Sequence, residues 1–120
     1  MSQYVLRKKT DKELKAITDS IVQKVLGNRS LSVSKIILYG SYARGDANDD
    51  SDIDIMILCN NDKDYVQEHE RDIWHEVDYV GLDNDIMIQT VVQSEDYFDY
   101  WVDDLPFYRN VKTDGVLLYG

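Results

Sequence analysis

Two short aliphatic runs, and the polar segment between them, constrain the fold of this chain more than any other feature. The first run is Lys35 to Tyr39 and stops at Gly40-Ser41; the second is Ser51 to Leu58. Short runs rich in isoleucine and leucine predict buried β-strands. The eleven residues from Gly40 to Asp50 are too many for a tight hairpin turn. Polar loops between core strands often carry functional sites, so the segment is a candidate site.

A capped amphipathic helix precedes the first run. Thr10-Asp11-Lys12-Glu13 has capping-box spacing, in which Thr10 caps the first turn and Glu13 reaches back to it. Apolar residues then recur at helical spacing, at Leu14, Ile17, Ile21 and Val25. Gly27-Asn28 is a plausible stop signal. The pattern predicts a helix from about Asp11 to Leu26 with one apolar face.

The remaining elements follow from similar signals. In chain order they are an edge strand at Tyr4 to Leu6, a helical turn at Tyr42 to Gly45, a helix from Lys63 to Gly81 capped by Asp62, a strand from Asp85 to Val92, a helix capped by Ser94 and interrupted by Pro106, and a strand from Val116 to Tyr119. This order predicts an α/β (α+β) fold, a small mixed β-sheet with helices packed on it. We expect a single domain over residues 1–120.

Composition limits the class of protein. The single cysteine, Cys59, leaves no intramolecular disulfide, which fits a reducing compartment. No run of about 18 apolar residues occurs, and the N-terminus lacks an apolar signal core, so we expect a cytoplasmic protein with no membrane partner. Because 23 acidic residues face 13 basic ones, with a net charge of −10, a nucleic-acid partner is disfavoured. The oligomeric state stays open, and a homo-oligomer is compatible with the sequence.

Two aspartates open the second run. Alternate residues of a strand point to the same face, so Asp52 and Asp54 project together while Ile53 and Ile55 enter the core. Neighbouring carboxylates repel each other, and a divalent cation relieves that repulsion. Oxygen ligands favour Mg²⁺, which completes its coordination with water and substrate phosphates. Alone, such a pair is more often a solvated strand face than a metal site.

The end of the first run offers groups that suit a phosphate. Glycine at Gly40 lets the backbone approach a phosphate closely, and the hydroxyl of Ser41 and nearby amides would hold its oxygens. Arg44 either reaches the same phosphate or pairs with a carboxylate to brace the loop. A lone Gly-Ser is usually only a turn, but this one lies eleven residues before an Asp-x-Asp, with Arg44-Gly45 between them.

These residues together resemble a known family. Gly40-Ser41-Tyr42-Ala43-Arg44-Gly45, followed by Ser51-Asp52-Ile53-Asp54, is similar at every position to the signature of the minimal nucleotidyltransferases of the DNA polymerase beta-like superfamily. The resemblance implies the nucleotidyltransferase fold. It implies that Gly40 and Ser41 bind the triphosphate of ATP and that Asp52 and Asp54 coordinate Mg²⁺. The group transferred would be AMP, with pyrophosphate leaving.

A third carboxylate usually completes catalytic sites in this superfamily, on the strand after the second long helix. The resemblance implies Asp85, with Asp83 as the alternative in a shifted register and a plain turn residue as the other interpretation. Gln89, polar in an otherwise apolar strand, is a further residue that could face the same cleft.

The resemblance also suggests a partner, because many stand-alone members are encoded beside a HEPN toxin. Some act as antitoxins by adding AMP to a tyrosine of that toxin. Three functions stay open here: a protein adenylyltransferase with an antitoxin role, a catalytically weak module that neutralises its partner by binding, and an RNA-end transferase, which the charge disfavours. Aromatic residues near the C-terminus predict either core and helix packing or a partner surface: Tyr97, Tyr100, Trp101, Phe107 and Tyr108.

Overall fold

A four-stranded mixed sheet forms the centre of the computed structural model, which describes residues 7–120. The predicted edge strand at Tyr4 to Leu6 lies outside the described residues. The strands are β1 (Val33–Tyr39), β2 (Ile53–Cys59), β3 (Ile88–Ser94) and β4 (Val116–Tyr119), in the order β3-β2-β1-β4. β1 runs antiparallel to β2 and β4, and β2 runs parallel to β3. The predicted α/β fold with a small mixed sheet is confirmed.

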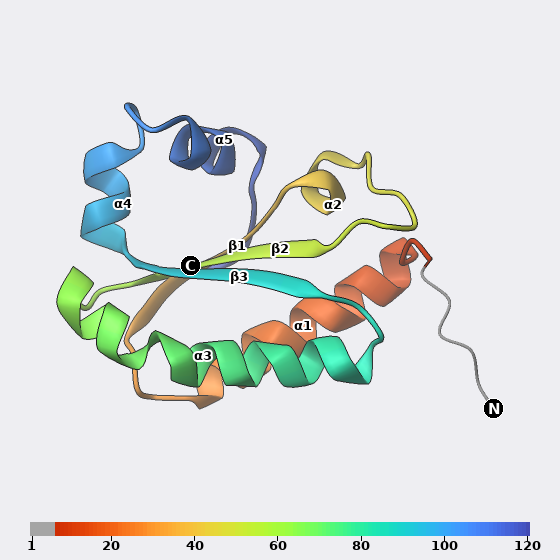
Figure 1. Ribbon diagram of the computed structural model, residues 1–120, viewed down its shortest axis with the longest axis horizontal. Helices are drawn as coiled ribbons and strands as arrows, with labels where there is room; N and C mark the ends of the chain where they lie inside the picture. Colours follow the sequence, from red (N-terminus) through yellow and green to blue (C-terminus); the bar gives the residue numbers. More distant parts are fainter. Residues whose placement is uncertain (1–6) are drawn as a thin grey trace.

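Helices cover both faces of this sheet (Figure 1). The long helices α1 (Asp11–Gly27) and α3 (Lys63–Asp83) lie on one face. The short helices α4 (Glu95–Trp101) and α5 (Pro106–Asp114) lie on the other, together with the single turn α2 (Ser41–Arg44). In the described part of the chain, no helix is long and apolar enough to cross a membrane.

Two apolar clusters follow from the alternation of side chains along the strands. Ile53, Ile55 and Ile57 of β2 pack with α1 and α3 in the larger cluster, as the sequence predicts for the first two. Met56 and Leu58 point to the opposite face and pack under α4 and α5. β2 is therefore covered on both faces from Ile55 onward, and only its first residues reach an open surface.

The helix signals were strong enough to place most boundaries. The capping box at Thr10 and Glu13 is present, and Asp62 caps α3 by accepting a hydrogen bond from the amide of Tyr65 at 2.8 Å. Ser94 caps α4, and Gly115 follows the last residue of α5. These predictions are confirmed.

The predicted start of the third strand is wrong. α3 continues to Asp83, and β3 begins at Ile88 rather than at Asp85. Asn84 ends the helix by donating from its side chain to the carbonyl of Val80 at 2.8 Å, and its own carbonyl accepts from Nζ of Lys9 at 2.6 Å. Asp85 then takes a left-handed conformation with φ 51°, which aspartate tolerates better than most residues. Asp85 therefore lies in the turn before the strand.

Candidate active site

One row of side chains crosses the sheet where the helical cover of α4 and α5 stops. Asp54 of β2 is paired in register with Tyr39 of β1 on one side and with Gln89 of β3 on the other. The next row on the same face, Ile37, Met56 and Val91, lies in the apolar cluster under α4 and α5. Tyr39 still packs against this cluster, whereas Asp54 and Gln89 lie outside it.

Gly40 lies directly against the carboxylate of Asp54. Its backbone has φ 76°, and a Cβ atom at this position would overlap Oδ2 of Asp54. Glycine is therefore required both for the backbone conformation and for the close approach. The contact places the end of β1, predicted to bind phosphate, beside Asp54 of β2, one of the two aspartates predicted to bind metal.

The turn α2 begins immediately after Gly40. The carbonyl of Gly40 accepts from the amides of Ala43 and Arg44, at 3.1 and 3.0 Å, so the amides of Ser41 and Tyr42 precede the first internal hydrogen bond. Gly45 ends the turn with φ 85° and ψ 14°, a left-handed cap that favours glycine. The predicted single helical turn over this segment is confirmed.

Arg44 pairs with a carboxylate, which is one of the two roles left open by the sequence. Its Nε lies 3.3 Å from Oδ2 of Asp46, which braces the exposed loop. Its charge also acts on Asp54, whose pKa it lowers. An anion bound beside Gly40 and Ser41 would therefore lie in the field of Arg44.

The surroundings of Asp54 disfavour its charged form. Burial raises the pKa of Asp54 above its usual value, the charge of Asp52 raises it further, and Arg44 opposes both effects only in part. Such a pair suits a hard divalent cation, because the cation relieves the repulsion and binds through carboxylate oxygens. The donor set of Asp52 and Asp54 therefore fits Mg²⁺ with substrate phosphates and water as its other ligands.

Gln89 occupies the strand position that faces the pair from β3. Its Nε2 donates to Oδ2 of Asp52 at 3.3 Å, so this residue does face the same cleft. Asp85 is separated from the pair by the register, since Ile53 pairs with Ile88 and Asp85 precedes β3. Over residues 7–120, no three carboxylate, histidine or cysteine side chains converge to hold a metal. The structure thus brings Asp52 and Asp54 together and does not add Asp85 to them; whether Asp85 acts in catalysis stays a prediction.

A hollow of about 350 Å³ lies beside Gly40 and Asp54, in the size range of small-molecule sites, roughly 300–1,000 Å³. Besides the residues predicted from the sequence, it is lined from β1 and α5 by Tyr39, Phe107, Asn110, Val111 and Asp114. The sequence did not single these residues out as site residues. No local signal could have done so, because the packing of α5 over the sheet brings them to the site.

The segment before α1 forms hydrogen bonds with the loops around the site. The amide of Lys9 donates to the hydroxyl of the buried Tyr42 at 3.0 Å, and Nζ of Lys9 reaches Asn84 in the turn before β3. The amide of Lys8 donates to Asp49 at 2.8 Å. One short segment thus connects α2, the loop before β2 and the turn before β3.

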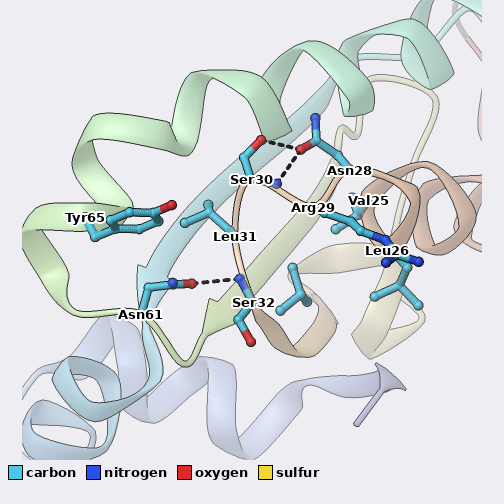
Figure 2. Close-up of a pocket in the computed structure, with 10 residues that line it drawn as sticks. Val25, Leu26, Asn28, Arg29, Ser30, Leu31, Ser32, Asn61 and Tyr65 are labelled. Carbon is cyan, nitrogen blue, oxygen red and sulfur yellow. Dashed lines mark hydrogen bonds between the residues drawn. The ribbon is translucent and has the colours of Figure 1, made fainter.

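A second hollow lies at the opposite end of β1, between the end of α1 and the start of α3 (Figure 2). Hydrogen bonds within the connection shape it: the amide of Ser30 donates to Asn28, and the amide of Ser32 donates to Asn61 at 2.7 Å. Its lining includes none of the motif residues. The motif residues therefore define a single candidate site at the other end of the strand.

Comparison with known proteins agrees with this geometry. Two Methanocaldococcus jannaschii proteins are each named "Putative protein adenylyltransferase". One is 35% identical over 109 residues, covering 91% of this chain and 97% of that protein. The other is 30% identical over 76 residues, covering 63% of this chain and 75% of that protein.

Solved structures share the fold. A toxin–antitoxin crystallised with AMP-PNP has a TM-score of 0.58 at 22% identity, covering 86% of this chain and 73% of that one. A mutant of the toxin–antitoxin MntA–HpeT has a TM-score of 0.56 at 19% identity, covering 86% and 72%. A family model described as a nucleotidyltransferase domain matches residues 9–112. With the glycine-serine turn and the aspartate pair in contact, the chain belongs to the nucleotidyltransferase domain family and is a nucleotidyltransferase.

Proposed function

We propose that this nucleotidyltransferase transfers AMP from ATP to a hydroxyl group of a partner protein. The observation that carries the proposal is the contact between Gly40 and Asp54, because it joins a phosphate-binding turn to a carboxylate pair within one small site. The names of the two Methanocaldococcus jannaschii relatives support protein as the acceptor class.

Each site residue has a role in this reaction. The hydroxyl of Ser41 and the first amides of α2 bind the oxygens of the triphosphate, and Arg44 neutralises part of its charge. Gly40 gives these oxygens room beside Asp54. Asp52 and Asp54 would hold Mg²⁺, which when bound neutralises charge on the phosphates. Gln89 orients Asp52 by donating to Oδ2.

The partner we propose is a HEPN-type toxin, with one of its tyrosines as the acceptor and an antitoxin role for this chain. Two toxin–antitoxin structures with the same fold support a protein partner. The hollow beside Gly40 is small, and the acceptor would be presented by the docked partner.

The test is to incubate the protein with ATP, Mg²⁺ and the protein encoded beside it, and to map the products by mass spectrometry. We expect AMP on a tyrosine of the partner. The conservative variant Asp52→Asn should abolish the adduct while the melting temperature shows that it stays folded. An unmodified partner in the wild-type reaction contradicts the proposal.

A second function, neutralisation of the partner by contact alone, is favoured by one observation. The position of β3 that faces the aspartates holds an amide, Gln89, and no three metal-ligating side chains converge in residues 7–120. The double variant Asp52→Ala/Asp54→Ala separates the two functions. If this variant still protects cells from the partner, binding is the function; if protection is lost while the complex still forms, transfer is. The single variant Asp85→Asn in the same assay tests the predicted third carboxylate.

A further inference from the structure

The hollow beside Gly40 has two chemically different sides. On one side lie the groups suited to phosphate: Gly40, Ser41 and Arg44. On the other side α5 contributes Phe107, Asn110 and Asp114. A carboxylate and an aromatic ring are unsuited to a triphosphate, because Asp114 would repel it. The same groups suit a neutral ligand part that offers a flat ring and hydroxyl groups.

Phe107 is placed to accept a ring. Its side chain meets Tyr39 edge to face, with centroids 5.6 Å apart and planes at 86°. Phe107 nevertheless remains 46% exposed, although aromatic residues on α4 and α5 such as Phe98 and Tyr108 are buried. Tyr39 is paired in register with Asp54. The aromatic pair thus borders the carboxylate site without adding charge to it.

The geometry of in-line displacement indicates that the α5 side of the hollow binds part of the donor nucleotide. In-line displacement places the attacking hydroxyl and the leaving pyrophosphate on opposite sides of the phosphorus. In the proposed function the pyrophosphate would lie at Gly40 and Ser41, at the end of β1, so the acceptor would approach from the side of β3 and Gln89. The α5 side adjoins β1. It is therefore not on the acceptor's path and is available to the rest of the donor.

We infer that Tyr39, Phe107, Asn110 and Asp114 form the nucleoside subsite, in which the base stacks on Phe107 and the ribose hydroxyls face Asn110 and Asp114. This inference rests on the proposed function, since it takes a nucleoside triphosphate as the donor. A flat base gains affinity by stacking on an aromatic face whichever base it is. A carboxylate that accepts from ribose hydroxyls is an arrangement that nucleotide-binding proteins also use elsewhere.

The experiment measures binding rather than transfer, by calorimetry in the presence of Mg²⁺ with two ligands, ATP and inorganic tripolyphosphate. We expect Phe107→Ala to weaken ATP binding by about fivefold, the lower end of the range for one stacked base, and to leave tripolyphosphate binding within about twofold. Phe107→Trp should keep ATP affinity. Tyr100→Ala is the matched control, because Tyr100 is a 73% exposed aromatic on α4 outside the hollow.

Two results overturn the inference. Equal weakening of both ligands by Phe107→Ala means that the residue supports the phosphate side. Unchanged ATP affinity, with transfer to the partner lost, means that the side takes the acceptor's ring. Selective weakening of ATP in a protein that labels no partner supports the subsite and contradicts the proposed function instead, so the two failures are distinguishable.

Discussion

Gly40 is the residue on which the site depends most directly. It permits two things that other residues do not: a positive φ and contact with Oδ2 of Asp54. Because the phosphate turn and the carboxylate pair share this point, a change at Gly40 must disturb both at once.

Gly40→Ala should therefore destabilise the protein and inactivate it. The left-handed backbone alone costs about 1–3 kcal/mol for a residue other than glycine, and the overlap with Asp54 displaces a carboxylate of the site. The matched control is Gly27→Ala at the end of α1, where an added Cβ meets nothing within 4 Å. Thermal unfolding and ATP binding of both variants provide the measurement. A Gly40→Ala protein as stable and active as the Gly27→Ala control would contradict the account.

Gln89 gives the site a neutral amide where a carboxylate would add a third negative charge. We expect Gln89→Asp to lower the stability of the metal-free protein by on the order of 1 kcal/mol, as for other like charges near the surface. Mg²⁺ should then raise the melting temperature of this variant more than that of the wild type, because the cation relieves a larger repulsion. Gln89→Asn is the neutral control. Equal Mg²⁺ shifts in the two variants would show that position 89 does not face the metal.

Among the secondary-structure elements, those with local signals were predictable. The capping box of α1 depends on residues close in sequence and appears as expected. Asp54 lies within β2 as the second aliphatic run predicted, whereas Asp52 directly precedes the first residue of that strand, Ile53. The start of β3 depends instead on Asn84 and Lys9, which meet across the fold. Periodicity within α3 could not reveal that contact, so the predicted strand began three residues early and included Asp85.

The residues of the candidate site also differ in whether local sequence signals predict them. The sequence singled out the residues that we propose bind phosphate and metal, because they lie at the end of one predicted strand and the start of the next. It did not predict Phe107, Asn110 and Asp114, because a helix pattern does not say which strand end the helix covers. The structure supplies this information through the packing of α5 against β1.

The capping box in the first turn of α1 should contribute measurably to the free energy of unfolding. Thr10 accepts from the amide of Glu13 at 3.1 Å, and Glu13 accepts from the amide of Thr10 at 3.0 Å. Thr10→Ala should cost about 1 kcal/mol, measured by denaturant unfolding, and Thr10→Ser should cost much less. A loss as large for Thr10→Ser as for Thr10→Ala would show that the hydroxyl cap is not the cause.

Acid should weaken the same turn. Arg7 and then the backbone of Thr10 lower the pKa of Glu13 well below its usual value of 4.5. A carboxylate whose pKa is lower in the folded than in the unfolded state stabilises the fold at pH values above its unfolded-state pKa. This contribution is lost as the pH falls from the unfolded-state pKa toward the folded-state pKa. The difference in stability between the wild type and Glu13→Gln should therefore shrink progressively below pH 4.5. A difference that stays constant with pH would contradict the ion pair and cap as its source.

At the scale of the whole molecule, β2 joins the two apolar clusters and ends in a fully buried thiol. Burial raises the pKa of Cys59 from 9.0 to about 11. The protonated thiol therefore contributes its full stabilisation of the folded state below pH 9, the pKa in the unfolded chain. This contribution is lost as the pH rises through 11, the pKa in the folded state. At pH 8 we expect alkylation of Cys59 only through global unfolding, at a rate that follows added denaturant. Alkylation as fast as in the unfolded chain would contradict a closed core.

In the proposed function, the site at one end of the sheet binds the donor nucleotide, and a partner protein supplies the acceptor. The most direct test compares ATP labelled at the α-phosphorus with ATP labelled at the γ-phosphorus, incubated with Mg²⁺ and the partner. Nucleotidyl transfer keeps the α-phosphorus, so the account predicts label on the partner from the first ATP alone, and none with Asp52→Asn. Label from the γ-phosphorus, or equal labelling by Asp52→Asn, would contradict it.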